Sequence, residues 1–332
     1  MVGSHLSDYI LSNEVDCKLF GAARWRSPLT NLDVSFALAR SKENVELELI
    51  HMDLTDPLGV DYALSKIPHL DCIYHLAAQS YPHVSFHSPL ETLNVNINGT
   101  FALLSAILKY HPTAKIHVCS SSEVFGRVPK DLVPISEDTP FHPASPYAIS
   151  KVGTDLISTY FSEAYDLNVF TTRMFTHTGP RRGDVFHEST FAKQIALIEI
   201  GAISDYTIRV GNLKSLRTYA DVRDAVVAYK LLMDSPNSKG QIYNIGGSYT
   251  CEVGATLQTL INQSSCAQDI NILVEQCRLR PIDADLQIPD ISKLTDAVDW
   301  SPKYTFNDTM KDLLSYWRNR VSMTSPASLL VR

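Results

Sequence analysis

The chain has 332 residues, 45% of them hydrophobic and 20% charged, with a formal net charge of -7. This composition is typical of a globular protein with one large or two smaller domains, and it excludes a mostly disordered chain. The acidic balance excludes a general nucleic-acid or anionic-membrane surface, because phosphate groups bind basic faces. No apolar run approaches the ~18 residues of a membrane span. The six cysteines include no CxxC pair, which indicates reduced thiols. We therefore expect a cytoplasmic protein with neither a nucleic-acid nor a membrane partner.

Short apolar stretches alternate with amphipathic ones in the first half of the chain. The stretch 88–111 has helical spacing. Five stretches have the length and the apolar content of strands, namely 17–24, 45–54, 71–78, 115–121 and 168–175. This alternation predicts an α/β fold, with a doubly wound parallel sheet and helices on both of its faces.

After residue 176 the alternation loosens, with a predicted helix over 188–200 and short strands in "YTIRVG" and "QIYNIGG". This change indicates a smaller C-terminal lobe wrapped onto the first domain. We expect a nucleotide-binding domain over 1–176, to which elements from 207–247 return. A substrate lobe over 177–320 and a loose tail over 321–332 complete the expected organisation.

The opening "MVGSHLSDYILSN" reads as the end of a glycine-rich turn that runs into a helix. In a doubly wound sheet such a turn follows the central strand and brings the backbone close to a pyrophosphate at the helix N-terminus. We therefore assign Gly3 to the cofactor site. No strand precedes it in this sequence, so we expect the neighbouring strands to have unpaired edges. Our interpretation is a truncation or a misplaced start codon, and the alternative is a native, frayed terminus.

A candidate catalytic set lies in "CSSSEVFG" and "SPYAISK". Tyr147 and Lys151 are spaced to share one helix face, and Ser121 and Glu123 follow a predicted strand about 26 residues earlier. A tyrosine is a poor base at neutral pH, and we expect the nearby ammonium to lower its pKa while the serine hydroxyl shares the substrate proton. A tyrosine and lysine at this spacing also occur by chance on helix surfaces. The order strand, serine, tyrosine and lysine in a βαβ series favours catalysis.

Cofactor recognition is indicated by "ARWRS", which follows the stretch predicted as strand 17–24. An arginine at this place meets a ribose 2′-phosphate, whereas an acidic residue would bind a 2′-hydroxyl. Arg24, Arg26 and Ser27 therefore point to NADP, and the alternative is a solvated basic turn. "MDLTD" places Asp53 and Leu54 near an adenine.

These segments, with "HTGPRRGDVF", "VGNLKSLRTYADVRD", "YNIGG" and "RLRP", resemble the extended short-chain dehydrogenase/reductases. Within that superfamily they are similar to the GDP-mannose 4,6-dehydratases and the GDP-4-keto-6-deoxy-mannose reductases. The resemblance covers roughly residues 1–318. It implies a Rossmann fold, a nucleotide-sugar substrate, tightly held NADP and a homodimer or homotetramer.

The resemblance also implies residue roles. Ser121, Tyr147 and Lys151 match the catalytic serine, tyrosine and lysine, and Glu123 matches the dehydratase base. Thr176 and Glu91 depart from the usual asparagine and tyrosine. The NADP contacts are matched by Gly3, Arg24, Trp25, Arg26, Ser27, Asp53, Leu54, Leu76, Ala77, Ala78, Gln79, Ser80, Lys151, His177 and Arg182. The substrate positions are matched by Ser85, Thr176, Lys193, Arg217 and Arg280.

Three cations in the second half suit the capture of a diphosphate, because guanidinium groups bind phosphate in a bidentate manner. Lys193, Arg217 and Arg280 are these residues, and each could alternatively be a surface charge. The histidines have no metal-ligand spacing, so we predict no metal site. The expected activity is conversion of GDP-mannose to GDP-4-keto-6-deoxy-mannose. The alternatives are GDP-4-keto-6-deoxy-mannose reduction, another NDP-sugar epimerase, and an inactive truncated paralogue that serves as a binding or structural partner.

Overall fold

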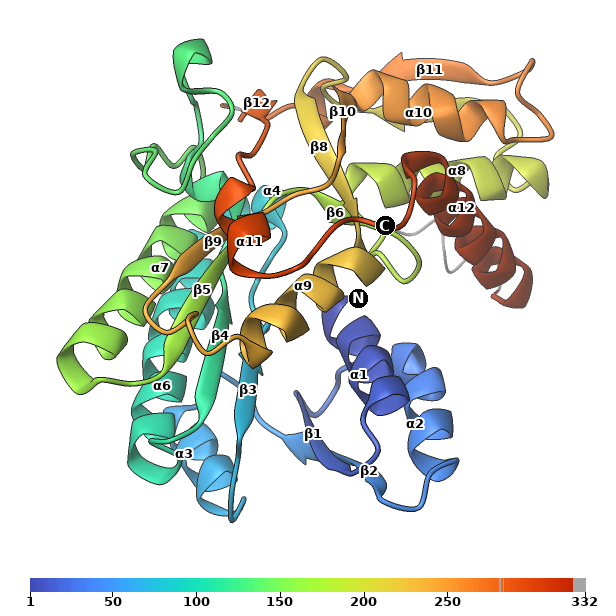
Figure 1. The fold of residues 1–332 in the computed structure, drawn as a ribbon. Helices are drawn as coiled ribbons and strands as arrows, with labels where there is room; N and C mark the ends of the chain where they lie inside the picture. The colour runs from blue at the N-terminus through green and yellow to red at the C-terminus, as the bar shows by residue number, and fades with distance from the viewer. Residues whose placement is uncertain (281, 283, 325–332) are drawn as a thin grey trace.

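The fold is built on a parallel sheet in the order β3-β4-β5-β9 (Figure 1). The computed structural model describes residues 1–280, 282 and 284–324. The strands are β3 (Cys72–His75), β4 (Lys115–Cys119), β5 (Val169–Met174) and β9 (Ile242–Ile245). Each adjacent pair is parallel. The predicted α/β class with a doubly wound parallel sheet is confirmed.

Side chains of β4 alternate between two cores, which shows that both faces of this sheet are covered. Ile116 and Val118 are fully buried in a cluster with helix residues such as Leu104. His117 points to the other face, where its ring packs 4.4 Å from the ring of Tyr229. Because successive side chains of a strand face opposite sides, this alternation fixes the register of β4.

Helices form a layer on each side of the sheet. The layer that shares the core of Ile116 consists of α3 (Pro57–Ser65), α6 (Gly99–Tyr110) and α7 (Pro146–Tyr165). The other layer contains α1 (Val2–Asn13) and α9 (Val222–Asp234), which pack on each other. The shorter elements of this half are η1 (Thr30–Leu32), α4 (Pro82–His87), α5 (Pro89–Leu93), the π-helical turn η2 (Asn94–Asn98), η3 (Ser122–Val124), η4 (Lys130–Leu132) and α11 (Ser292–Ala297).

The parallel sheet is interrupted where the sequence predicts unpaired edges. β1 (Cys17–Ala23) and β2 (Val45–His51) form a separate parallel pair, with α2 (Asp33–Arg40) packed on α1 beside them. Within the described part of the chain, no strand lies between β1 and β3. The gap is bridged by a small apolar cluster in which side chains of β1 and β3 pack around Leu6, Ile10 and Val226. The predicted unpaired edges are thus present.

The C-terminal lobe has two small sheets and three packed helices. One sheet contains β6 (His177–Thr178), β8 (Leu216–Asp221), β10 (Tyr249–Glu252) and β12 (Leu286–Gln287), and the other pairs β7 (Thr207–Val210) with β11 (Asn271–Val274). The helices are α8 (His187–Glu199), α10 (Val253–Asn262) and α12 (Phe306–Met323), and η5 (Gln276–Arg278) follows β11. Of the expected tail, 321–323 end α12, and 325–332 lie outside the described residues.

The C-terminal segment is fastened to the sheet domain through Asp224 of α9. The carboxylate of Asp224 accepts hydrogen bonds from the backbone N–H groups of Lys303 (3.0 Å) and Tyr304 (3.1 Å). The indole of Trp300 donates to the backbone oxygen of Asp224 at 3.0 Å. These bonds set the chain on its path into α12, which packs on α8.

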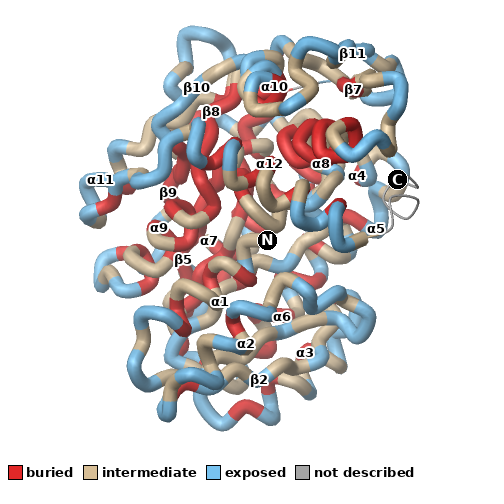
Figure 2. The backbone as a smooth tube through the Cα atoms, turned by 90° about the vertical axis from the view of Figure 1, so that its right-hand side faces the viewer, coloured by how far each residue is buried: buried red, intermediate tan, exposed pale blue. Residues whose placement is uncertain are grey.

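Buried residues are concentrated in β5, β9, α8 and α9, whereas the residues of β2, α2 and α3 are mostly half-buried or exposed (Figure 2). Among the helices that the structure describes, none has the length and apolar character to span a membrane.

Candidate active site

Helix α7 begins at Pro146 and therefore contains both Tyr147 and Lys151, which are four residues apart and share one face. Ser145 is its N-cap, and the Ser145 hydroxyl accepts a hydrogen bond from the backbone N–H of Ala148 at 3.0 Å. Pro146 occupies the first helical position, where its missing N–H costs nothing. Residues at i and i+4 then lie one above the other. Both side chains are buried, and both line the cleft described below.

A buried ion pair fixes the rotation of α7 against the sheet. Asp155, one turn after Lys151, lies 3.1 Å from the guanidinium of Arg173 on β5. The Ser120 hydroxyl, at the end of β4, donates to the Asp155 carboxylate at 2.8 Å. Because a buried charge is tolerated only when paired, this contact holds the face of α7 that carries Tyr147 and Lys151 toward the ends of β4 and β5.

The surroundings of Tyr147 disfavour ionisation of its phenol. Burial raises the pKa of Tyr147 well above its ordinary value, and a hydrogen bond with Ser121 only partly opposes that shift. We expected Lys151 to lower this pKa. The Lys151 ammonium instead donates to the carbonyl of Cys119 at 2.7 Å, and burial lowers the pKa of Lys151. In this state the phenol therefore retains its proton.

Glu123 is placed by the short helix η3 at the C-terminal end of β4. The Ser121 hydroxyl caps this helix by accepting from the backbone N–H of Glu123 at 3.2 Å. The Glu123 carboxylate lies 3.6 Å from the guanidinium of Arg280, which comes from the segment after η5. A carboxylate of the sheet domain and an arginine of the lobe thus meet across the cleft.

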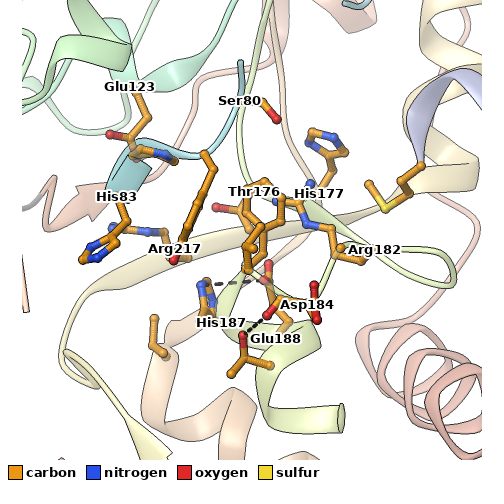
Figure 3. Close-up of a pocket in the computed structure, with 18 of the residues that line it drawn as sticks. Ser80, His83, Glu123, Thr176, His177, Arg182, Asp184, His187, Glu188 and Arg217 are labelled. Atoms are coloured by element: carbon orange, nitrogen blue, oxygen red, sulfur yellow. Dashed lines mark hydrogen bonds and ion pairs between the residues drawn. The ribbon is translucent and has the colours of Figure 1, made fainter. Parts of the chain in front are cut away.

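A cleft of about 1160 Å³ lies between the sheet domain and the lobe. Figure 3 shows Ser80 and Glu123 from the sheet domain opposite His187 and Arg217 from the lobe. The structure brings together most of the predicted site at this cleft, namely Gly3, Leu76, Ala78, Ser80, Ser121, Glu123, Tyr147, Lys151, Thr176, His177, Arg182, Lys193, Arg217 and Arg280.

The end of the cleft beside α1 suits a pyrophosphate. Gly3 is in the first turn of α1, whose N-terminal N–H groups favour an anion. Arg182 is half-buried beside it, stacked 3.5 Å from the ring centroid of Phe186. Its Nε has no hydrogen-bond partner among the described residues. Burial and Arg182 lower the pKa of His177 to about 3, so this histidine adds no charge. A buried guanidinium donor at a helix N-terminus fits the diphosphate of a dinucleotide.

The remaining predicted residues do not line the cleft. Arg24 and Ser27 form a turn just beyond β1, and Asp53 accepts hydrogen bonds from Thr55 beyond β2. Ser85 is buried and donates to the carbonyl of Pro82 at 2.6 Å. Leu54 packs in the core. The full set outside the cleft is Arg24, Trp25, Arg26, Ser27, Asp53, Leu54, Ala77, Gln79 and Ser85.

The cations of the lobe are held by neighbours. The Lys193 ammonium lies 2.9 Å from the carboxylate of Asp184, and both side chains are largely buried. The Arg217 guanidinium donates to the carbonyls of Leu216 (3.1 Å) and Ala284. These bonds fix both groups at the cleft wall.

Three residues that line the cleft, two acidic and one histidine, were not predicted from the sequence. Asp184, His187 and Glu188 lie between the predicted Arg182 and Lys193, all within 13 residues of "RRGDVFHESTFAK". Glu188 is fully buried, and neither carboxylate oxygen has a hydrogen-bond partner among the described residues. His187 lies 3.6 Å from it and 2.9 Å from the hydroxyl of Tyr219. The high density of charged residues in this stretch could have identified it as part of the site. In the described part of the chain, no group of three or more such side chains is placed to hold a metal ion.

A Rossmann sheet with a serine after β4 and a tyrosine and lysine on the adjacent helix α7 defines a short-chain dehydrogenase/reductase of the extended epimerase/dehydratase type. The chain belongs to the GDP-mannose 4,6 dehydratase family, whose model matches residues 1–313.

Two curated relatives are similar at 28% identity. One is the GDP-6-deoxy-D-mannose reductase of Pseudomonas aeruginosa, aligned over 81% of this chain and 86% of that protein. The other is the GDP-mannose 4,6-dehydratase of Vibrio cholerae serotype O1, aligned over 94% and 90%. The solved structure of RMD from Pseudomonas aeruginosa complexed with NADPH is 26% identical, with a TM-score of 0.77 over 92% of this chain and 99% of that one. The family is therefore that of sugar-nucleotide dehydratases and reductases.

Proposed function

We propose that the protein is a sugar-nucleotide 4,6-dehydratase that converts GDP-mannose into GDP-4-keto-6-deoxy-mannose. The observation that carries this proposal is the carboxylate of Glu123 in the same cleft as Ser121, Tyr147 and Lys151. A dehydratase needs a base for the C5 proton in addition to the group that moves the O4 proton. The family match and the dehydratase relatives support the assignment.

The chain's residues divide the proton transfers between them. Tyr147 exchanges the proton of O4, and Ser121, bonded to its hydroxyl, shares that proton. Once C4 is a ketone, the C5 proton is acidic enough for a carboxylate, so Glu123 takes it. Glu123 then passes this proton to the C6 hydroxyl, which leaves as water while a C5–C6 double bond forms. The Arg217 and Arg280 guanidinium groups bind the substrate diphosphate, and Lys193, paired with Asp184, supports that wall.

We assign the cofactor as NADP. The chemistry that a bound NADP supplies is reversible hydride acceptance, which leaves no net redox change in a dehydration. The pyrophosphate end fits Gly3 and Arg182, as shown above. The side chains of Arg24 and Arg26, just beyond β1, suit the 2′-phosphate because it carries a negative charge that NAD lacks. The related reductase structure contains NADPH.

Glu123→Gln tests the assignment, because it is nearly isosteric and removes only the base. We expect turnover of GDP-mannose to fall by about 10²–10⁴-fold, the usual contribution of a general base. Oxidation at C4 should persist, seen as a rise of bound NADPH absorbance in a single turnover without a 6-deoxy product and without C5 hydrogen exchange. Glu252→Gln, which changes an exposed glutamate of β10, is the control. Turnover of Glu123→Gln close to that of the control would contradict the proposal.

A GDP-4-keto-6-deoxy-mannose reductase is the second candidate, supported by the relative from Pseudomonas aeruginosa, which is a GDP-6-deoxy-D-mannose reductase. Such an enzyme would consume NADPH stoichiometrically with the 4-keto-6-deoxy substrate. It would not dehydrate GDP-mannose. Measuring both reactions on the wild-type protein separates the two candidates.

We further propose a cytoplasmic homodimer formed through α6 and α7. Ile149, Leu156 and Tyr160 recur at helical spacing along α7 and are 45–57% exposed, and Phe101 of α6 stacks on Tyr160. A second copy of the same face would bury this stripe, as isologous interfaces do. Leu156→Glu should shift the mass in solution toward the monomer. The control is Leu58→Glu on α3, which is 81% exposed and lies off the stripe.

A further inference from the structure

We propose that Arg280 restrains Glu123 in the resting protein and releases it when a diphosphate binds to Arg280. Arg280 is then a positioning residue for the base as well as a phosphate ligand. The inference rests on the proposed function, because it takes Glu123 as the base and Arg280 as a diphosphate contact.

The restraint is visible in the geometry of the pair. The Arg280 Nη1 and the Glu123 Oε1 are 3.6 Å apart, and their side chains are only 26% and 17% exposed. Among the described residues, no other cation lies within ion-pair distance of the Glu123 carboxylate. The guanidinium and the carboxylate attract each other, so the pair holds the Glu123 side chain toward the lobe. At rest, the Glu123 carboxylate is therefore engaged by Arg280.

The pair joins two parts of the chain that are fixed independently. Glu123 is anchored through η3 to the end of β4, where Ser121 caps the short helix. Arg280 belongs to the lobe segment that follows η5 and β11. The charge of Arg280 also reaches His83 and His187, whose pKa values it lowers in addition to the effect of burial. This guanidinium therefore lies among groups on both walls of the cleft.

A diphosphate competes well for Arg280. It carries more negative charge than one carboxylate, and its oxygens match the bidentate geometry of a guanidinium. When the guanidinium turns to the diphosphate, Glu123 loses its partner and becomes available to the sugar. The C5 proton is then removed only after the nucleotide end of the substrate is seated, which protects the reaction from starting on a poorly placed ligand.

A double-mutant cycle on ligand binding tests this exchange without requiring activity. We would measure the Kd of GDP by calorimetry for wild type, Glu123→Gln, Arg280→Gln and the double variant. In the wild-type background, GDP must break the ion pair, so Glu123→Gln should tighten GDP binding. In the Arg280→Gln background only general repulsion is relieved. We expect the gain to be about three- to tenfold larger with Arg280 present, the scale of a partly buried ion pair.

Arg278→Gln is the matched control, because it removes the same charge from the same wall while Arg278 pairs with Glu275 at 2.6 Å. Glu123→Gln should keep its full gain in that background. Equal gains with and without Arg280 would overturn the exchange. Guanosine, which has no phosphate, should show no gain in any background.

The same cycle with inorganic pyrophosphate separates this inference from the proposed function. If wild type binds pyrophosphate with the expected coupling but does not bind GDP, then the exchange stands and the GDP assignment fails. If GDP binds and GDP-mannose is dehydrated while neither probe shows coupling, then the function stands and the exchange is refuted. The absence of binding by both probes would refute both.

Discussion

The two parts of the interrupted parallel sheet differ in burial although they share one architecture. All six residues of β5 are buried, whereas none of the seven residues of β1 is. β5 is paired on both sides by β4 and β9, while β1 pairs with no described strand other than β2. The residues that we propose as catalytic belong to the well-packed part, and the arginines that we propose for the 2′-phosphate follow β1. Position in the sheet, more than strand composition, thus decides how firmly each half of the site is held.

The largest expected effect concerns the well-packed part. Tyr147→Phe removes one hydroxyl at the edge of the cleft and should lower turnover by about 10²–10⁴-fold, as the loss of a proton-transfer group does. Because the ring and its packing remain, the melting temperature should change little. Steady-state rates and thermal unfolding on the same preparations check this. A loss of activity that merely followed unfolding would show that Tyr147 supports the fold rather than the chemistry.

Matched core substitutions measure the difference in packing directly. Ile116→Ala on β4 removes a fully buried side chain and should lower the free energy of unfolding by about 2–5 kcal/mol. Ile50→Ala on β2, a half-buried position, should cost less than half as much. Urea unfolding of both variants gives the comparison. Equal losses would mean that the β1-β2 pair is as tightly packed as the main sheet.

Closing the gap should remove the difference. An added apolar strand of about seven residues, fused ahead of Met1 through a Gly-x-x-Gly turn, would pair with the open edges of β1 and β3. Each added backbone hydrogen bond contributes about 0.5–1.5 kcal/mol before the cost of ordering the strand. We expect a higher melting temperature, tighter NADP binding and slower amide exchange in β1. A polar extension of equal length is the control, and an identical gain from it would refute strand insertion.

The smallest effect concerns the less buried part. Arg24→Ala should weaken NADP binding by about 1–3 kcal/mol, the scale of a charge-assisted contact, and leave NAD binding unchanged. Arg40→Ala, which removes an exposed arginine at the end of α2, is the control. Fluorescence titration of each variant with NADP and with NAD measures the two affinities. Equal losses for NADP and NAD would show that Arg24 maintains the turn after β1.

Local patterns were sufficient to predict the regular elements and the interruption of the sheet. The five predicted strands appear as β1 to β5, and the helix expected over 188–200 is α8. The spacing of Tyr147 and Lys151 predicted a shared helix face because helix geometry alone fixes it. The unpaired edge of β1 was also predictable, because the sequence opens on a glycine turn with no strand ahead of it.

Tertiary contacts explain what the sequence left open. The helix expected over 88–111 contains a π-helical turn at Asn94–Asn98. There the Asn96 side chain bonds the backbone of Gln79 (2.8 and 3.0 Å) and the hydroxyl of Ser150 (2.8 Å). The meeting of Glu123 and Arg280 depends in the same way on how the lobe folds back. No local period encodes contacts between residues this far apart in the chain.

The fastening of the C-terminal segment to Asp224 has a consequence for biosynthesis. The sheet cannot gain its last strand until β9 emerges from the ribosome, and the Asp224 carboxylate cannot gain its backbone donors until residues 303 and 304 follow. Until then α9 has a partly buried, unsatisfied carboxylate, and the face of α8 that α12 covers remains exposed. A nascent chain therefore stays incomplete until residue 304 has been made, and such long-range closure makes folding slow and dependent on protection from aggregation.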